Sequence, residues 1–355
     1  MTGLTVQSPI NALIGLAGNF YSRDNSKLSK NHHPLVSVVL LSYNRPAYLQ
    51  QALDSLLSQS YKNLEITVVD NQSPASAEVA LIVNLHPNVK LIQNSINLGY
   101  AGGMNTGIAQ ADGDYVLLTE DDIILDKDCV RNLVEYLYEE PTADLISPII
   151  YNRTEGTIRF AGGSLTLGGV FRREIYGAGE RDTGQFTEPF NVGYIDGAMM
   201  FDRRDFWKQF KGFREDYFMY VDAVELCTRV SKAGKSMAVV PQAKAYHFEP
   251  HHKPAPPEIE FHKVKNFFAL HLLHAPARNL PEFICRYLII NGLRTLLGRN
   301  GNSRQVFLKA LVWVARKTPS LLKERYAQNR ALSPDPSRDD LNSIRSIPPA
   351  LKPGE

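Results

Sequence analysis

The sequence predicts an α/β protein in which helices flank a mostly parallel sheet and a helical segment follows at the C-terminus. Three observations predict this fold. From Val36 to Leu118, short runs rich in aliphatic and β-branched residues alternate with helical patterns, as in β-α-β units. The 44% hydrophobic and 21% charged residues are typical of a globular chain. A length of 355 residues suits one large domain with an appendage.

The first half of the chain carries the regular alternation. Strands are predicted at 36–41, 64–69, 89–93 and 115–118, and helices after Pro46, near 76–85 and from about Ala101 to Ala111. Proline suits the first position of a helix, where its missing N–H is not needed. The section from Ser147 to Asp196 is rich in glycine, threonine and aromatic residues and predicts an antiparallel extension or lid. A second strand-helix-strand unit is predicted at 195–201, through Glu225 to Ala233, and at 237–241.

Charge and composition predict four parts: an N-terminal arm (1–34), the α/β domain (35–250), a basic helical segment (251–330) and a disordered tail (331–355). From Lys253 to Arg330 there are fourteen Lys or Arg and four Glu, a charge of +10, whereas the whole chain has +2. Basic residues interleaved with Leu, Ile, Phe and Trp favour helices on an anionic membrane surface, although a solvated face of packed helices has the same pattern.

The sequence also indicates where in the cell the protein is located. No segment has the roughly 18 uninterrupted apolar residues of a spanning helix, and no secretory signal pattern is found at the start of the sequence. Three cysteines without short spacing favour neither a disulfide framework nor a cysteine-rich zinc site. We therefore expect a cytoplasmic protein, at the inner face of the cell membrane. The basic segment has no recognition motif for nucleic acid, so no nucleic-acid partner is expected.

Polar residues follow each predicted strand, at the edge of the sheet where open α/β folds bind ligands. They are Ser42 to Arg45, Asp70 to Ser73, Asn97 to Gly103, and Thr119 to Asp122. The G-x-G-x-x-G and P-loop patterns are absent after the first strand, which excludes the usual dinucleotide and P-loop sites. Three adjacent acids, Glu120, Asp121 and Asp122, repel one another unless a cation offsets their charge. A hard divalent metal that also holds substrate phosphates fits this cluster.

These motifs together resemble those of the inverting, GT-A-fold glycosyltransferases of family two, especially rhamnosyltransferase-like and galactofuranosyltransferase-like members. The resemblance extends from about Val36 to Phe248. It rests on V-S-V-V-L-L-S-Y-N-R, V-V-D-N-Q-S, N-x-G-Y-A-G-G-M-N-x-G, T-E-D-D, G-A-M-M-F-x-R-R, F-x-E-D-Y-F-M-Y and A-Y-H, in this order. Each motif alone is weak, but their order at the strand ends is specific.

The resemblance implies a nucleotide-sugar site. Asp70 would accept the N3–H of uracil or thymine, which favours a UDP- or dTDP-sugar; the alternative is an aspartate that caps the following helix. Tyr43 and Arg45 would flank the nucleotide, by stacking and by meeting base or phosphate. The other implied donor-binding residues are Ser42, Asn44, Asn97, Gly99, Gly102, Glu120 and Asp121.

The resemblance also implies a metal site for Mg²⁺ or Mn²⁺. Asp122 ends the motif that corresponds to the D-x-D motif of the family, in which Glu120 replaces the commoner Asp or Asn. His247, in A-Y-H, stands where the family often has a further metal ligand, although a lone histidine is more often structural.

The position of the catalytic base departs from the family. The base is expected in Val221-Asp222-Ala223-Val224-Glu225, where Ala223 occupies its place, and alanine cannot accept a proton. Loss of a general base typically costs roughly 10² to 10⁴ in rate. Three alternatives remain open: a deliberate Asp-to-Ala substitution made to trap a substrate complex, a neighbouring carboxylate (Asp222 or Glu225) that acts instead, and a naturally inactive homologue that binds a nucleotide sugar without turnover.

The acceptor is expected at residues from the middle section and beside the second acidic helix, namely Gly162, Gly163, Asp196, Gly197 and Tyr220. The resulting hypothesis is inverting, metal-dependent transfer of a sugar to a hydroxyl of a saccharide, glycolipid or polysaccharide. Rhamnose is the first choice by resemblance, and galactofuranose, glucose and galactose remain open. A nucleotidyltransferase is the alternative enzyme, although such enzymes usually carry a glycine-rich, basic loop after the first strand.

Overall fold

The computed structural model describes residues 33–168, 171–248, 256–292, 295 and 301–332. Ten strands form one mixed sheet, along which eight follow the order β10-β12-β6-β11-β4-β1-β2-β3. β5 pairs with β12 and β7 with β6 at the side of this path. Contacts group the residues from Leu35 onward into one unit and Met1–Pro34 into another. The expected arm at 1–34 and tail at 331–355 lie almost entirely outside the described residues.

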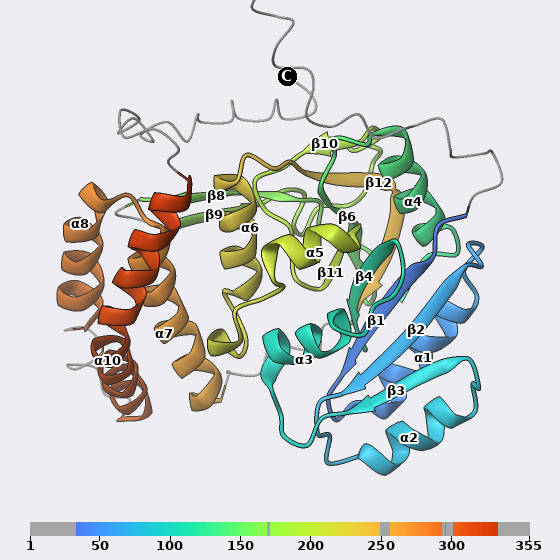
Figure 1. Ribbon diagram of the computed structural model, residues 1–355, viewed down its shortest axis with the longest axis horizontal. Helices are drawn as coiled ribbons and strands as arrows, with labels where there is room; N and C mark the ends of the chain where they lie inside the picture. Colours follow the sequence, from blue (N-terminus) through green and yellow to red (C-terminus); the bar gives the residue numbers. More distant parts are fainter. Residues whose placement is uncertain (1–32, 169–170, 249–255, 293–294, 296–300, 333–355) are drawn as a thin grey trace, which may run out of the picture. The chain divides into compact units, whose positions relative to one another are not determined.

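The N-terminal half of the sheet is the expected series of β-α-β units (Figure 1). Its four parallel strands are β1 (Val36–Ser42), β2 (Leu64–Asp70), β3 (Val89–Gln93) and β4 (Tyr115–Glu120). The helices between them are α1 (Pro46–Leu57), α2 (Ser76–Asn84) and α3 (Gly99–Ile108). Pro46 is the first residue of α1, as predicted. All seven residues of β1 are buried, because it lies between β2 and β4 in the middle of the sheet.

The second half of the sheet is mixed. β11 (Met199–Arg203) runs antiparallel to β4 and to β6 (Leu145–Asn152), and β12 (Met237–His247) runs parallel to β6. The smaller strands are β5 (Ile123–Leu125), β7 (Ile158–Phe160) and β10 (Phe190–Asn191). β6 begins the section expected to form an extension, yet all eight of its residues are buried in the main sheet, since it is apolar on both faces.

Only part of the middle section forms a separate sheet, a hairpin of β8 (Gly163–Leu167) and β9 (Phe171–Ile175). The helices of this half are α4 (Cys129–Glu139), α5 (Arg204–Phe210), the short 3₁₀ helix η3 (Glu215–Tyr217) and α6 (Asp222–Lys232). The predicted second strand-helix-strand unit differs in its first strand, which begins at Met199 and runs antiparallel to β4. The extended pattern at 195–201 could not reveal that direction.

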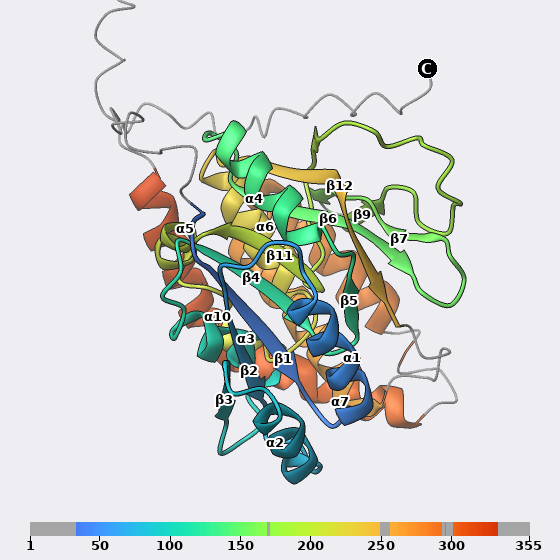
Figure 2. The same cartoon turned by 90° about the vertical axis from the view of Figure 1, so that its right-hand side faces the viewer.

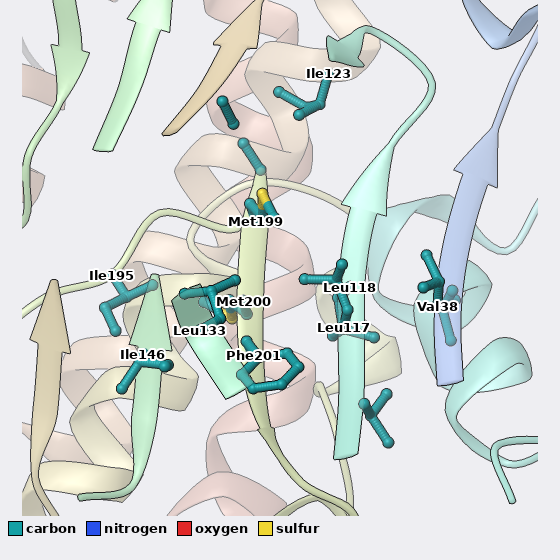
Figure 3. Packing of buried hydrophobic residues seen from close by; sticks show 14 of the residues in the cluster. Val38, Leu117, Leu118, Ile123, Leu133, Ile146, Ile195, Met199, Met200 and Phe201 are labelled. Atoms are coloured by element: carbon teal, nitrogen blue, oxygen red, sulfur yellow. The ribbon is translucent and has the colours of Figure 1, made fainter. Parts of the chain in front are cut away.

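The core joins both halves of the sheet. Figure 3 shows side chains of the neighbouring strands β4 and β11, among them Leu117, Leu118, Met200 and Phe201, and all four are fully buried. Because consecutive strand residues point to opposite faces, apolar side chains fill the core on both sides of the sheet. Burying a large apolar side chain stabilises the fold by about 1.5 to 3 kcal/mol. This packing fixes the strand ends from which the polar residues project.

The C-terminal segment is helical, with α7 (Pro257–His274), η4 (Ala277–Asn279), α8 (Leu280–Ile284), the π-helix η5 (Cys285–Asn291) and α10 (Gly301–Leu332). α7 packs against both α6 and α10 (Figures 1 and 2). Within the described residues, no helix combines the length and the apolar character that crossing a bilayer requires. α7 contributes buried polar side chains, Lys265, Asn266, His271 and His274, to the same unit as the sheet.

Candidate active site

The predicted polar residues meet at the carboxyl ends of β1, β2 and β4. In the sheet register Ser42 pairs with Asp70, and Leu41 pairs with Glu120. Asp70 and the acidic cluster therefore lie on either side of the end of β1. The ends of parallel strands line one edge of the sheet, so the sequence order alone predicted this convergence.

The acidic cluster is tied to the loop after β1 by charge-assisted hydrogen bonds. Asp121 is fully buried and accepts hydrogen bonds from the Ser42 hydroxyl (2.9 Å) and the Tyr43 amide (3.1 Å). The Arg45 guanidinium lies 2.6 Å from the other Asp121 oxygen and also binds Asp122. Arg45 was expected to contact the base or a phosphate. Here its positive charge offsets the negative charges of Asp121 and Asp122, which explains how two buried carboxylates can lie together at one strand end.

The ionised forms of Glu120 and Asp121 at this edge of the sheet are energetically unfavourable. Burial, together with the negative charge of Asp122, raises the pKa of Glu120 to about 8. Burial also raises the pKa of Asp121 to about 6 despite its contact with Arg45. Both shifts favour the protonated carboxyls, so an added cation would stabilise the ionised forms.

The two expected metal ligands lie together. The Nε2 atom of His247, the last residue of β12, is 3.7 Å from Oδ1 of Asp122. The Phe248 amide donates to the Asp122 carbonyl (3.0 Å), which holds the end of β12 at the acidic loop. Two ligand atoms that are each about 2.1 Å from one ion can be up to about 4.2 Å apart, so the pair fits one divalent cation. In the described part of the chain, no group of three or more His, Cys, Asp or Glu residues is arranged to hold a metal.

Asp70 makes hydrogen bonds at the start of α2, as expected for an aspartate that caps the following helix. Its side chain is fully buried, and its carboxylate accepts hydrogen bonds from the Ser73 amide (2.9 Å) and from the hydroxyl of Ser76, the first residue of α2. These bonds leave room for a further donor, since a carboxylate can accept about four hydrogen bonds. Tyr43, in the loop after β1, is 44% exposed.

The residues expected to form a glycine-rich loop are in fact the short link Asn97–Leu98 and the first turn of α3, which begins at Gly99. Asn71, for which no separate role was predicted, holds them in place. Its amide donates to Asn97 Oδ1 (3.1 Å) and to the Gly99 carbonyl (2.9 Å), and its oxygen accepts from the Leu98 amide (3.0 Å). Gly99 has φ +70°, and a Cβ there would lie 2.2 Å from the Phe218 carbonyl oxygen. Glycine is therefore required for close approach of two parts of this chain. A Cβ at Gly102 would meet Leu98 at 2.7 Å.

The acidic helix α6 presents Asp222 at its first position. Asp222 is 6% exposed, and its Oδ1 accepts a hydrogen bond from the Ala223 amide (2.7 Å), whereas Oδ2 is buried without a hydrogen-bond partner among the described residues. Burial raises the pKa of Asp222 to about 7, and the charge of Asp196 acts in the same direction. Ala223 is 5% exposed, and its Cβ lies 3.4 Å from the position that a Cβ on Gly197 would take.

Glu225 is held in a different way. Its fully buried carboxylate binds Arg229 (2.9 Å) and His274 Nε2 (3.0 Å). Although burial acts in the opposite direction, Arg229 and His274 lower the pKa of Glu225 to about 2. A carboxylate with this pKa is a weak proton acceptor near neutral pH. It also lines a cavity of about 330 Å³ with Arg214, Arg229 and Glu324, on the side of the C-terminal helices.

The segment before α6 is strained. Phe218, Tyr220 and Val221 have φ of 65°, 63° and 65°. The Met219 amide donates to the Tyr217 carbonyl (2.8 Å), so Phe218, with ψ −65°, is the centre of a γ-turn. Each left-handed non-glycine residue costs on the order of 1 to 3 kcal/mol, and such residues persist where surrounding contacts fix them.

The expected acceptor residues divide into two groups. Gly162 and Gly163 are required by internal packing, because a Cβ would meet Val192 at 2.4 Å and the Glu174 carbonyl oxygen at 2.3 Å. Asp196, Gly197 and Tyr220 lie nearer the acidic helix. The Tyr100 hydroxyl donates to the Gly197 carbonyl (2.5 Å), and burial, with the charges of Glu120, Asp222 and Asp196, raises its pKa. Tyr100 is thus a common neighbour of the acidic residues, which the glycine-rich motif around it concealed.

Comparison with known proteins agrees with this geometry. Residues 37–210 match the profile of the family described as Glycosyl transferase family 2. This part of the chain is therefore similar to a family 2 glycosyltransferase domain. The match covers β1 to α5 and hence the ends of β1, β2 and β4. α6 and His247 lie beyond the matched residues.

Relatives and solved structures are similar over most of the described chain. N-acetylglucosaminyl-diphospho-decaprenol L-rhamnosyltransferase of Mycobacterium tuberculosis is 26% identical over 237 residues, 61% of this chain and 77% of the relative. An uncharacterized glycosyltransferase of Haemophilus influenzae is 25% identical over 213 residues, 59% of this chain and 64% of the relative. The structure of GalNAc-T7 with UDP, GalNAc and Mn²⁺ has a TM-score of 0.57 and 15% identity over 81% of this chain and 57% of that chain. The predicted fold class is confirmed by the sheet and by this likeness.

Proposed function

We propose that this protein is a glycosyltransferase, which transfers a sugar, with inversion, from a UDP- or dTDP-sugar to a hydroxyl of a saccharide or lipid-linked glycan. The proposal is supported by the position of Asp70 and the acidic cluster at the ends of neighbouring strands, in a part of the chain similar to family 2. Asp222 is close enough to Tyr100 to raise its pKa together with Glu120 of that cluster. An inverting transfer is a single in-line displacement at the anomeric carbon, which needs a held diphosphate and a base for the acceptor proton.

Donor binding is assigned to the ends of β1 and β2. Asp70 would use its remaining acceptor capacity for the N3–H of uracil or thymine, with Ser73 and Ser76 orienting the carboxylate. Tyr43 would stack on the base, and Asn97 and Gly99, braced by Asn71, would lie beside the ribose and sugar. The donor-binding site would also include Ser42, Asn44 and Asp121, which would support the loop after β1.

The metal site is assigned to Asp122 and His247. Mg²⁺ or Mn²⁺ would be held by these two side chains and by diphosphate oxygens, and it would stabilise the negative charge of the leaving nucleotide. Asp122 must first release Arg45, whose guanidinium would then be free to meet the diphosphate. Glu120 would contact ribose or sugar hydroxyls.

The base is assigned to Asp222. This choice follows the alternative in which a neighbouring carboxylate accepts the proton because Ala223 cannot. Its buried, unpartnered oxygen and its pKa of about 7 suit proton abstraction from an acceptor hydroxyl near neutral pH. Glu225 has a pKa of about 2 and is bound on the other side, so it is not assigned this role. The acceptor would lie near Asp196, Gly197 and Tyr220.

Rhamnose is the proposed sugar and a lipid-linked glycan the proposed acceptor, because the relative of Mycobacterium tuberculosis carries both in its name. α10 offers a matching surface. Leu308, Val312, Leu322 and Tyr326 are exposed and fall on one face at the 3.6-residue period. Exposed Lys309, Arg316 and Lys323 flank this stripe. Apolar residues bordered by cations favour an anionic membrane face, where a lipid-linked acceptor would lie.

The deciding experiment follows release of UDP or dTDP from a panel of nucleotide sugars, with Mn²⁺ and saccharide or lipid-linked acceptors, in the unmodified chain (with Ala223) and in Ala223→Asp. Turnover in both, lost in Asp222→Asn, supports the proposal. Turnover that appears only in Ala223→Asp moves the base to position 223. Donor binding without turnover in either would favour a nucleotide-sugar-binding protein.

A further inference from the structure

The strained segment Phe218–Val221 is fixed from outside the sheet domain. Asn266 of α7 is fully buried, and its Nδ2 lies 2.8 Å from the Tyr217 carbonyl oxygen, 2.9 Å from that of Met219 and 2.7 Å from that of Tyr220. The two protons of this one amide nitrogen are thus shared among three main-chain carbonyls of a segment that local preference would not keep in this conformation. The three carbonyls converge only while the left-handed residues keep their present angles.

Lys265, the neighbour of Asn266, fixes the orientation of that amide. Its Nζ donates to Asn266 Oδ1 (2.7 Å) and to the Asp216 carbonyl (2.5 Å). A lysine has no acceptor, so the atom that it contacts must be the amide oxygen, and the amide nitrogen must face the segment. Lys265 is 2% exposed, and its ammonium also lies 4.7 Å from the ring of Trp313 in α10.

Side chains of α7 also cover the segment. The ring of His262 stacks on Phe218 with centroids 4.5 Å apart, and Lys263 Nζ lies 4.8 Å from the Tyr220 ring. One side of the segment is therefore in contact with α7 along its length, as the neighbouring ribbons in Figure 1 indicate.

The segment in turn touches both assigned halves of the active site. The Phe218 carbonyl accepts a hydrogen bond from the Ala101 amide (3.0 Å) in the first turn of α3, and it is the atom that excludes a side chain at Gly99. At its other end, Val221 is the residue directly before α6, where Asp222 begins the helix. A change of conformation at Phe218–Val221 would therefore move the start of α3, which is assigned to donor binding, or Asp222, or both.

We propose that Lys265 and Asn266 are positioning residues of the proposed transferase, which hold Phe218–Val221 and thereby set Asp222 against the start of α3. The inference rests on the proposed function for its catalytic meaning, but the contacts themselves can be tested without turnover. It gives the C-terminal helices a second role besides any membrane contact, because α7 supplies the hydrogen bonds that maintain the strained conformation.

Hydrogen–deuterium exchange of the full chain tests the positioning directly. Asn266→Asp keeps the side-chain shape and removes the donor; Lys265→Met removes the ammonium and keeps most of the stem. In each variant, exchange of peptides spanning 217–223 should become at least about tenfold faster, with peptides of β1 and β4 unchanged. If Asn266→Asp does not fold, Lys265→Met alone decides. Unchanged exchange over 217–223 in a folded variant overturns the proposal.

The matched control is Asn132→Asp. The Asn132 amide also donates to a main-chain carbonyl, that of Gln242 at 2.6 Å, but it lies on α4. This variant should leave exchange over 217–223 as in the unmodified chain. Acceleration there by Asn132→Asp equal to that by Asn266→Asp would mean a general loosening and would overturn the specific role.

Kinetics and binding separate this inference from the proposed function. UDP and dTDP titrations with Mn²⁺ test donor binding, and their failure together with absent turnover overturns the function while the exchange result stands by itself. With turnover, Asn266→Asp should lower kcat by roughly 10²-fold and change the donor KM little, since a displaced base affects the chemical step. Lys265→Arg should retain most of kcat. An unchanged kcat in Asn266→Asp overturns the positioning role.

Discussion

The Nε2 atom of His274 lies 3.0 Å from a carboxylate oxygen of Glu225, and both side chains are fully buried. Burial lowers the pKa of His274, and Glu225, with its low pKa, is ionised and can only accept. The neutral imidazole therefore donates its Nε2–H. This bond joins α6 to α7 and makes Glu225 a connection between the acidic helix and the C-terminal helices.

Replacement of this carboxylate should destabilise the fold. Glu225→Gln leaves Arg229 without its buried partner, so we expect a loss of about 3 kcal/mol in the free energy of unfolding at pH 7, measured by denaturant titration. Because the folded pKa is about 2 and the ordinary value is 4.5, this stabilisation is complete above about pH 4.5 and is lost as pH falls through 2. The difference between variant and unmodified chain should shrink accordingly.

The control for that measurement is Glu282→Gln. Glu282 pairs with Arg286 at 2.9 Å, but both side chains are about half exposed. An exposed pair contributes about 0 to 1 kcal/mol, so this variant should change the free energy little. A similar small loss in Glu225→Gln would contradict the structural role of Glu225.

Asp222→Asn should abolish most transfer. If Asp222 is the base, turnover falls by roughly 10² to 10⁴. In the unmodified chain kcat/KM then rises with pH and levels off above about 7, because only the ionised carboxylate accepts a proton. The pH–rate profile and the single-variant rate are the measurements. Asp205→Asn, in the first turn of α5, is the control and should keep the profile of the unmodified chain. A profile without a limb near 7 would argue against this assignment.

The raised pKa of Asp222 also has a consequence for stability. Between the ordinary pKa of 3.8 and the folded value of about 7, the folded chain retains a proton that the unfolded chain releases. Stability from this group therefore falls as pH rises through that window. Unfolding curves of Asp222→Asn from pH 4 to 8 should lack this component.

The nucleotide and metal assignments predict different binding defects. Asp122→Ala should weaken UDP or dTDP binding only when Mn²⁺ is present, since it removes a proposed metal ligand. Asp70→Ala should weaken it with or without Mn²⁺, by about 1.5 to 3 kcal/mol for a lost hydrogen bond to a charged group. Isothermal titration with and without metal separates the two. Equal titrations in both variants and the unmodified chain would refute both assignments.

The surface of α10 predicts binding to anionic membranes. The unmodified chain should sediment with vesicles containing phosphatidylserine and remain free of purely zwitterionic vesicles. Combined replacement of Lys309, Arg316 and Lys323 by Gln should reduce binding, at about 1 kcal/mol per residue. Lys62, Lys90 and Lys211, replaced together, form the control because they lie in the sheet domain. Binding that is insensitive to the α10 replacement and to salt would refute this surface.

Local patterns predicted the first half of the fold well. β1, β2, β3 and β4 follow the expected runs to within two residues, because each is a short apolar run bounded by turn-forming residues. β6 was expected in an extension and is a central strand, and β11 runs antiparallel to β4. Strand direction depends on the path of the intervening chain, and an apolar run in the sequence contains no information about that path.

The sequence by itself determined the fold class, the strand ends and the residue types that gather there, because these follow from periodicity and from the rule that parallel strands end at one edge. Tertiary structure alone decided how the carboxylates differ. Asp222 and Glu225 are three residues apart on one helix, yet one has an unpartnered oxygen and the other is bound by His274. Their partners come from distant parts of the chain, and burial and neighbouring charges set a pKa, so spacing could not separate them.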